Sequence, residues 1–334
     1  MMSMEWFWFR ENEKNELTLL RMFGDSPVVR VPDHIAGKKV VAAGAYCFSE
    51  KCVYTGKETE VKCAGDGTEE ELSHALETKR VCSISGAYPV EIILPDSLVE
   101  IGDLAFYQCK CLERLSVGEK LSKIGSDAFM NCRKLQEFIF RNSPKRATAL
   151  RQILAQRPGE TTAYFEEGET TGAIVFPEYT EGYDVIGPAH IFSLNIEGEG
   201  FRARQCFENG IFQFEKYDRI FGQACDTEEV LVLCRMAALR ILYPVRLSEE
   251  RKREYLAYLV SHQESFYDFL IENDSLELVG ELYHKGILEQ KDIELCIQRT
   301  VKKHSPEGTR RLLAWKKEWE AAGDEEEYGF EAFS

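Results

Sequence analysis

The residues with the most potential for chemistry are the cysteines, of which the chain has 11. Cys109, Cys111 and Cys132 would provide three thiolates for zinc, but a structural zinc site requires four converging ligands, usually as two close pairs. Cys109 and Cys132 are 23 residues apart, which is the period of a sequence repeat described below. Because an unligated cysteine behaves as a small apolar residue, we expect these two to stack as buried side chains in neighbouring repeats.

The other candidates for metal binding or nucleophilic chemistry are weaker. Cys47, Cys52 and Cys63 follow one another at spacings of five and eleven residues without a following histidine pair, so a zinc clip there is an alternative to packing. No HExxH or similar ligand pair and no nucleophile motif includes any histidine, these being His34, His74, His190, His262, His284 and His304. A catalytic triad could still assemble in space. The local sequence predicts no catalytic residue, no metal and no cofactor.

The charge balance argues against nucleic acid and membrane partners. With a net charge of -16, most of the surface should repel a phosphate backbone. The most apolar helical segment, Val230 to Tyr243, is interrupted by Arg235 and Arg240 and is too short for a membrane span. The segment from Gly198 to Gly200 lacks the third glycine and the strand-to-helix setting of a dinucleotide-binding loop.

The start of the chain and the cysteine content predict a cytoplasmic location. Met1 to Phe9 has no basic lead and an apolar run of only four residues, unlike a secretory signal. An odd number of cysteines without an export signal is typical of reduced thiols. The apolar run, Trp6 to Phe9, is an aromatic cluster that we expect to cap the open end of a repeat array, with docking of a partner as the alternative.

A repeat of 23 residues determines the predicted architecture. Shifting the sequence by this number aligns seven identical pairs within fifteen positions, namely Leu98 with Leu121, Ile101 with Ile124, Gly102 with Gly125, Ala105 with Ala128, Phe106 with Phe129, Cys109 with Cys132 and Leu112 with Leu135. The period falls within the range of about 20 to 29 residues of a leucine-rich repeat, whose units each supply one short parallel strand.

In this register each strand has alternating apolar residues. The side chains expected to point inward are those of Ile92, Leu94, Leu115, Val117, Phe138 and Phe140. Their neighbours should point outward and form the candidate protein-binding site, which we call the strand face: Glu91, Ile93, Arg114, Ser116, Glu137 and Ile139. Glu91, Arg114 and Glu137 would align as alternating charges. They would form either a self-satisfied ladder or contacts for a protein partner.

A more distant copy of the repeat lies 58 residues upstream of the first. There Gly44 and Phe48 match Gly102 and Phe106, while Ala43 and Cys47 replace the equivalent isoleucine and alanine. The difference between 58 and 23 predicts a 35-residue insertion near 50–86, with an acidic helix near Glu69 to Leu76. Insertions in repeat arrays usually emerge on one face, often the binding face.

These residues resemble a known family. Leu94-Pro95-Asp96 followed by Ile101-Gly102, Ala105-Phe106, Cys109 and Leu112 is similar to the BspA-type leucine-rich repeat of bacteria, and Val31-Pro32-Asp33 with Gly37-Lys38 and Val40 resembles its first repeat. The resemblance covers roughly Val28 to Phe140. It implies a solenoid with a binding function. Family members are often surface adhesins, which require an export signal that this sequence lacks.

After the repeats, the sequence pattern changes twice, first to a glycine-rich segment and then to a helical pattern. Ser143-Pro144 predicts a helix start leading into 147–156, and strands are expected at 162–165 and 173–176. The glycine-rich segment 182–200 predicts a loop with short strands. Beyond it, helices are expected at 227–242, from a Ser248 cap to about 262, and at 264–272, 275–285, 291–304 and 307–321.

The predicted fold class is α+β, a leucine-rich-repeat solenoid with short parallel strands followed by a mostly α-helical repeat-like domain. Starts some 33 residues apart, at Asp274-Ser275 and Glu307-Gly308, weakly resemble ankyrin repeats. The expected domains are a β cap (1–27), BspA-like repeats (28–142), a capping helix and β-rich connector (143–214), an α-helical, ankyrin-like module (215–322) and an acidic flexible tail (323–334).

Three functions are compatible with these predictions. The leading hypothesis is a non-enzymatic cytoplasmic scaffold or adaptor that binds protein partners through its repeat and helical surfaces. A secreted or cell-surface adhesin whose recorded start omits the signal is the second. An enzyme with a site in a cleft between the two modules, near 182–200, is the third.

Overall fold

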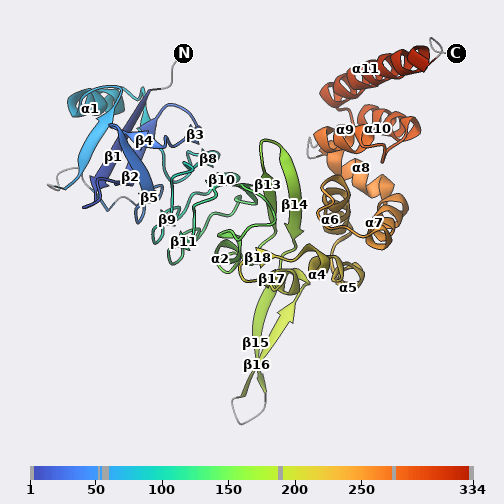
Figure 1. Cartoon of the computed structure of the whole chain (residues 1–334), viewed down its shortest axis with the longest axis horizontal. Helices are drawn as coiled ribbons and strands as arrows, with labels where there is room; N and C mark the ends of the chain where they lie inside the picture. The colour runs from blue at the N-terminus through green and yellow to red at the C-terminus, as the bar shows by residue number, and fades with distance from the viewer. Residues whose placement is uncertain (1–3, 52, 55–59, 187–190, 273–275, 331–334) are drawn as a thin grey trace. The chain divides into compact units, whose positions relative to one another are not determined.

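The structure is a computed structural model that describes residues 4–51, 53–54, 60–186, 191–272 and 276–330 (Figure 1). It divides into two compact units, Met1–Thr227 and Glu228–Ser334, which are described separately. The division falls after α5 (Phe221–Thr227), whereas the predicted helical module begins at 215. The helices α4 (Phe214–Asp218) and α5 thus belong to the first unit.

The first unit contains the predicted solenoid, whose outer ladder is a six-stranded sheet. The strands, in spatial order, are β14 (Thr170–Phe176), β13 (Thr161–Glu166), β12 (Glu137–Arg141), β10 (Arg114–Gly118), β8 (Glu91–Ile93) and β3 (Val28–Arg30). All neighbours pair in parallel except β13 and β14, which are antiparallel. Arg114 lies opposite Glu91 on one side and Glu137 on the other, so the 23-residue register is confirmed.

A second ladder runs along the other side of the same coils. β5 (Lys38–Ala43), β9 (Glu100–Ile101) and β11 (Lys123–Ile124) pair in parallel, with Ala43 opposite Ile101 and Ile101 opposite Ile124. The pairing of β5 with β9 confirms the 58-residue offset of the upstream copy. This ladder continues into the N-terminal sheet through β2 (Leu17–Gly24), β1 (Glu5–Glu11) and β6 (Lys62–Gly65). The sheet has the order β11-β9-β5-β2-β1-β6, with β4 (His34–Ile35) beside β5.

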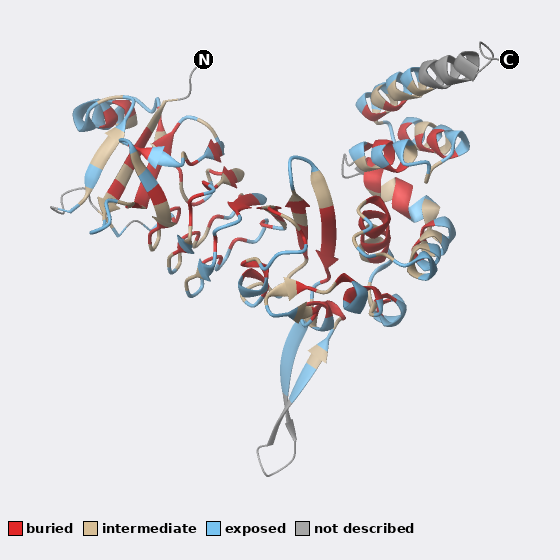
Figure 2. Cartoon of the chain, in the orientation of Figure 1, coloured by how far each residue is buried: buried red, intermediate tan, exposed pale blue. Residues whose placement is uncertain are grey.

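Buried residues line both ladders of the solenoid (Figure 2), and most of them are apolar. Phe48, Phe106 and Phe129 form a stack along the solenoid, with ring centroids 5.0 Å and 5.5 Å apart. The six strand residues predicted to point inward are all buried, Phe138 and Leu115 completely. Since each coil covers the apolar side of the next, the core is continuous along the repeats.

Close approach between coils explains the repeated glycines. A Cβ atom on Gly125 would lie 2.4 Å from the backbone nitrogen of Asp103, and one on Gly102 would lie 2.7 Å from that of Ala45. Only glycine permits such proximity of two backbones. The coils also turn at equivalent residues in the left-handed conformation, such as Leu104 (φ 54°).

The predicted insertion closes the N-terminal end of the solenoid. It contains β6 (Lys62–Gly65), which pairs with β1 (Glu5–Glu11), and β7 (Cys82–Ser83), which pairs with β2 (Leu17–Gly24). Between them lies the expected acidic helix, α1 (Glu69–Glu77), which begins with a capping box at Thr68.

The aromatic cluster at the start of the chain belongs to this cap. Trp6 and Phe23 pack with three residues from and just after α1, Leu72, Ala75 and Val81, in one buried cluster. Phe7 and Phe9 are buried as well, whereas Trp8 is half-buried. Packing therefore accounts for the aromatic run.

The C-terminal end of the solenoid is closed by side chains from α2 (Leu150–Leu154) and the residues after it. Gln152 accepts from the N–H of Ile124 and donates to the carbonyl of Ser122. Gln156 does the same for Ala128 and Gly125, at 2.9 Å each. The two side-chain amides thus replace the backbone of an absent next coil.

The predicted helix start at Ser143-Pro144 is wrong, because α2 begins only at Leu150. The hydroxyl of Ser143 accepts from the N–H of Lys145 in a local turn instead of capping a helix. Such side-chain to backbone bonds compete with helix formation. The hydroxyl of Thr148 accepts from the N–H of Leu150, close to the actual start.

The segment from 182 to 200, predicted as a loop with short strands, contains most of a β-hairpin. β15 (Thr180–Ile186) pairs antiparallel with β16 (Ile191–Glu197) over their full lengths. The hairpin is followed by α3 (Gly200–Ala203) and a small sheet of β17 (Phe207–Glu208) and β18 (Ile211–Phe212). The two strands predicted before it correspond to β13 and β14.

The second unit is helical, as expected. Its helices are α6 (Val230–Leu242), α7 (Glu249–Ser261), α8 (Gln263–Glu272), α9 (Leu276–His284), α10 (Gln290–Lys302) and α11 (Pro306–Phe330). Ser248 caps α7 by accepting from the N–H of Arg251. The ankyrin-like start at Asp274-Ser275 lies outside the described residues. Because α11 extends to Phe330, most of the segment predicted as a flexible tail is helical.

We predict that Phe106→Ala destabilises the first unit by about 3–5 kcal/mol, since it removes the middle ring of the stack and leaves a cavity between two coils. The free energy of unfolding in urea measures the effect. Met130→Ala is the control, because Met130 is 49% exposed and should change stability by less than about 0.5 kcal/mol. Equal effects of the two substitutions would contradict the stacked core.

Gln156→Ala should cost about 1–3 kcal/mol, because the N–H of Ala128 and the carbonyl of Gly125 lose their partner at the end of the solenoid. Thermal unfolding is compared with that of Arg151→Ala, a nearby exposed position on α2 whose side chain does not close the ladder. If both variants unfold at the same temperature, the side-chain amide of Gln156 does not stabilise the end of the solenoid.

Candidate functional site

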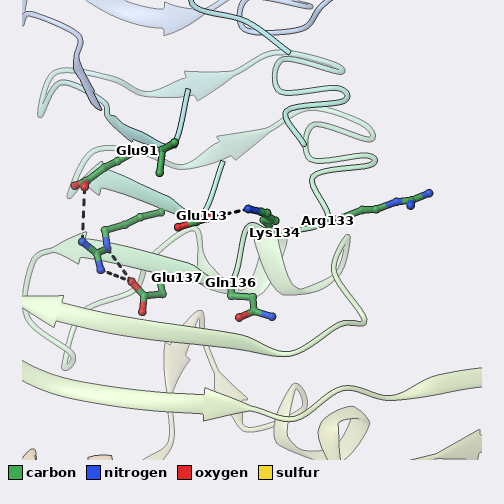
Figure 3. Close-up of a pocket in the computed structure, with 8 residues that line it drawn as sticks. Glu91, Glu113, Arg133, Lys134, Gln136 and Glu137 are labelled. Carbon is green, nitrogen blue, oxygen red and sulfur yellow. Dashed lines mark hydrogen bonds and ion pairs between the residues drawn. The ribbon is translucent and has the colours of Figure 1, made fainter. Parts of the chain in front are cut away.

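The strand face lies on the outer side of the six-stranded sheet, and its central feature is a row of alternating charges from three strands. Nε of Arg114 donates to Oε2 of Glu137 at 2.7 Å, and Nη1 lies 3.6 Å from Oε2 of Glu91 (Figure 3). The pair with Glu137 is therefore a close hydrogen-bonded contact, whereas the contact with Glu91 is looser. The predicted alignment of the three side chains is confirmed.

The arginine of this row is only partly desolvated. The Arg114 side chain is 45% exposed, and those of Glu91 and Glu137 are 23% and 31% exposed. Partial burial acts to lower the pKa of Arg114, but the charges of Glu137 and Glu91 outweigh it and raise the pKa above its usual value. Because water reaches the row, its ion pairs contribute little to folding stability.

The second row of the strand face differs from the prediction at Ser116. Ile93 and Ile139 are half-buried, but Ser116, which lies opposite both of them, is buried. The reason is Arg141, whose Nη1 donates to the Ser116 hydroxyl at 2.5 Å and whose Nη2 lies 2.7 Å from Oδ1 of Asp96. The guanidinium covers the serine, so this residue is not available to a partner.

A pocket of about 420 Å³ lies beside the charged row. It is lined by the row itself and by residues that precede the strands: Val90, Glu91, Glu113, Arg114, Arg133, Lys134, Gln136 and Glu137. Lys134 contacts Glu113 at 3.3 Å. Figure 3 shows Arg133 pointing away from the row. The pocket is lined mainly by charged and polar groups of both signs.

Sequence reasoning missed the residues that precede the strands. Val90, Glu113 and Gln136 occupy equivalent positions at 23-residue intervals, one residue before each member of the charged row. The repeat register therefore contained the signal needed to find them. On β13 the face is extended by Tyr164, which lies opposite Ile139 and is half-buried, whereas Thr162, opposite Glu137, is buried. This extension had no such signal, because β13 does not follow the 23-residue period.

The comparison with protein families identifies the repeated segment. Residues 86–149 match, in six copies, the family described as "BspA type Leucine rich repeat region". This segment consists of BspA-type leucine-rich repeats. Repeats of this type indicate a role in protein binding or adhesion. The upstream copy at 43–48 lies outside the match but joins the BspA-type repeats through the pairing of β5 with β9.

Two solved structures resemble the chain. A leucine rich cell surface protein from Faecalibacterium prausnitzii has 20% identity over 41% of this chain and 31% of its own, with a TM-score of 0.26. A leucine-rich-repeat protein of T. pallidum has 17% identity over 40% of this chain and 68% of its own, with a TM-score of 0.22. The chain thus spans about a third of the first of these proteins. No curated protein matches the sequence.

The cysteines of the BspA-type repeats are packed as expected. Cys109 and Cys132 are buried, and their thiols donate to the carbonyls of Phe48 and Phe106 at 3.1 Å and 2.9 Å. The hydrogen bond with Cys132 and burial raise the pKa of Cys109 well above its usual value, while the same bond lowers that of Cys132. Within the described residues, no three His, Cys, Asp or Glu side chains converge as metal ligands would. Cys52, part of the alternative zinc clip, lies outside those residues.

The described helices include none with the length and apolarity needed to cross a membrane.

We predict that burial protects most of these thiols from alkylation near neutral pH. Burial raises the pKa of Cys206 to about 11 and those of Cys234 and Cys296 to about 12, so these groups stay protonated and are poor nucleophiles. Cys225 is exposed and should react first with iodoacetamide, as measured by mass spectrometry of peptides. Labelling in urea provides the control in which all thiols react. If Cys109 reacted as fast as Cys225 in the folded protein, its buried position would be wrong.

Proposed function

We propose that this protein is a non-enzymatic interaction scaffold and that the strand face of its BspA-type repeats contacts a protein partner. The observation that carries the proposal is the open charged row beside two half-buried isoleucines, Ile93 and Ile139. A surface that combines partly desolvated charges with apolar side chains is typical of protein interfaces.

The geometry favours partner contacts over a purely structural ladder. Glu91 lies 3.6 Å from Arg114, which leaves its carboxylate with hydrogen-bonding capacity, and Arg114 remains 45% exposed. Exposed ion pairs of this kind are worth less than about 1 kcal/mol to stability, so the row is a weak stabilising device. The adjoining pocket offers a partner both acidic and basic groups within one recess.

We further propose that the protein acts in the cytoplasm. The thiols of Cys109 and Cys132 serve as hydrogen-bond donors to the repeat backbone, a role that requires their reduced form. The reducing cytoplasm preserves that form. Fractionation of intact cells tests the location. Recovery of the protein from the medium or the cell surface would favour the adhesin alternative.

The strand face is tested with the double variant Arg114→Glu, Ile139→Asp in a pull-down from native lysate. We expect loss of the partners recovered with the wild-type chain, because the substitution places three acidic side chains in a row and adds a charge to the apolar row. The matched control is Lys123→Glu, Met130→Asp, which changes the same residue classes at exposed positions outside the face. Recovery of the same proteins by both variants would show that the strand face is not the interface.

A further inference from the structure

The hairpin of β15 and β16 is an exposed arm on a firmly positioned base. Figure 1 shows it extending beyond the solenoid and the small β17–β18 sheet, and Figure 2 shows that its described residues are mostly exposed. The two strands form a sheet of their own, and no third strand pairs with them in the described part of the chain. An isolated two-stranded hairpin is only marginally stable in water, so an arm of this length has open edges that a further strand could satisfy.

The base of the arm is held by a buried guanidinium. Arg204 donates to five carbonyl oxygens around the two ends of the hairpin, those of Arg157, Pro158, Gly159, Pro177 and Gly200. The guanidinium carbon also lies 5.0 Å from the centre of the Tyr179 ring, which precedes β15.

The two ends of the arm are packed closely against each other where the arm joins the rest of the first unit. A Cβ atom on Gly200 would lie 2.1 Å from the carbonyl oxygen of Pro177, so the two ends of the arm pass in direct backbone contact. The arm is therefore anchored to the first unit rather than joined to it by a free linker.

The arm exposes large apolar side chains on one side. Tyr183 is 67% exposed and Leu194, directly opposite on β16, is 49% exposed. Side chains alternate along a strand, so residues two positions apart share a side. Glu181 and Ile196, which pair two positions from Tyr183 and Leu194, therefore lie on this side as well. The combination of an apolar side with open backbone edges is what strand addition by another chain requires.

The charge around the β15–β16 arm indicates which kind of peptide segment could bind to it. Between Arg157 and Arg202 the sequence contains no lysine or arginine. It contains nine acidic residues in the same interval: Glu160, Glu166, Glu167, Glu169, Glu178, Glu181, Asp184, Glu197 and Glu199. Four of these residues belong to the arm or directly precede it, namely Glu178, Glu181, Asp184 and Glu197. Glu166, Glu167 and Glu169 lie at the turn between β13 and β14, and Glu199 is buried and pairs with Arg202. The charged residues of the arm itself are therefore all acidic, which attracts basic segments and repels nucleic acid and anionic lipid.

We propose that the β15–β16 arm binds a basic, extended protein segment, with alternating cationic and apolar residues, as an added strand. The cations of the segment face the acidic side chains, and its apolar residues cover Tyr183 and Leu194. A second copy of this chain fits less well, because two such arms would bring like charges together. The inference concerns a different surface from the strand face and does not depend on it.

The experiment titrates the full chain into fluorescein-labelled ten-residue peptides and measures anisotropy at low and high salt. The probe alternates lysine and valine. The comparison peptides alternate glutamate and valine, or contain the probe's residues as one lysine block and one valine block. We expect the alternating basic peptide to bind at least about ten-fold more tightly than either, because only it matches both the charge and the two-residue period.

The variants separate the two contributions. Tyr183→Ser, Leu194→Ser should weaken binding about ten-fold at any salt concentration, and Glu181→Lys, Glu197→Lys should weaken it mainly at low salt. Val28→Ser, Met130→Ser is the control, because its positions are 52% and 49% exposed outside the arm. Circular dichroism checks that each variant is folded.

Several outcomes would overturn the proposal. Equal binding of the alternating basic and acidic peptides excludes recognition by charge. Equal binding of the alternating basic peptide and the block peptide excludes strand addition. Unchanged binding by the two arm variants places the peptide elsewhere. If light scattering shows a wild-type dimer that Tyr183→Ser, Leu194→Ser converts to monomer, a second copy occupies the arm and the proposed partner is wrong.

Discussion

Direct backbone contact between successive coils is the constraint on which the rest of the first unit depends. At Gly102 and Gly125 one coil approaches the previous one too closely for any side chain. This approach sets the spacing at which Phe48, Phe106 and Phe129 stack and at which the two ladders form hydrogen bonds. The strand face follows from the same spacing, since it places one charged side chain of each coil beside the next.

At the two ends of the solenoid, the backbone hydrogen-bonding groups that lack a neighbouring coil are paired in different ways. At the N-terminal end, β1 and β2 continue the ladder, and the insertion adds β6, β7 and α1 around them. At the C-terminal end, the amides of Gln152 and Gln156 substitute for a strand. The insertion, which repeat arrays often use for binding, serves here mainly to bury aromatic residues of the cap.

The features of the solenoid that could be predicted from the sequence are those repeated in it. The 23-residue period determined the strand register, the buried phenylalanines and the alignment of Arg114 with its two glutamates. The burial of Ser116 could not be predicted, because it depends on Arg141 crossing the face to reach Asp96 in another coil. The short strands expected within 182–200 were not assigned to one hairpin, because the glycines and the low apolar content of this segment are typical of loops.

The pair formed by Gln152 of α2 and Gln156, just after that helix, makes the number of coils in the array adjustable. Each amide contacts only the backbone of the coil beside it, and that backbone has the same course in every repeat. A duplicated coil placed before α2 would present identical groups to Gln152 and Gln156. Gain or loss of whole repeats is thus compatible with an unchanged terminus, and the area of the strand face can grow or shrink by one charged residue at a time.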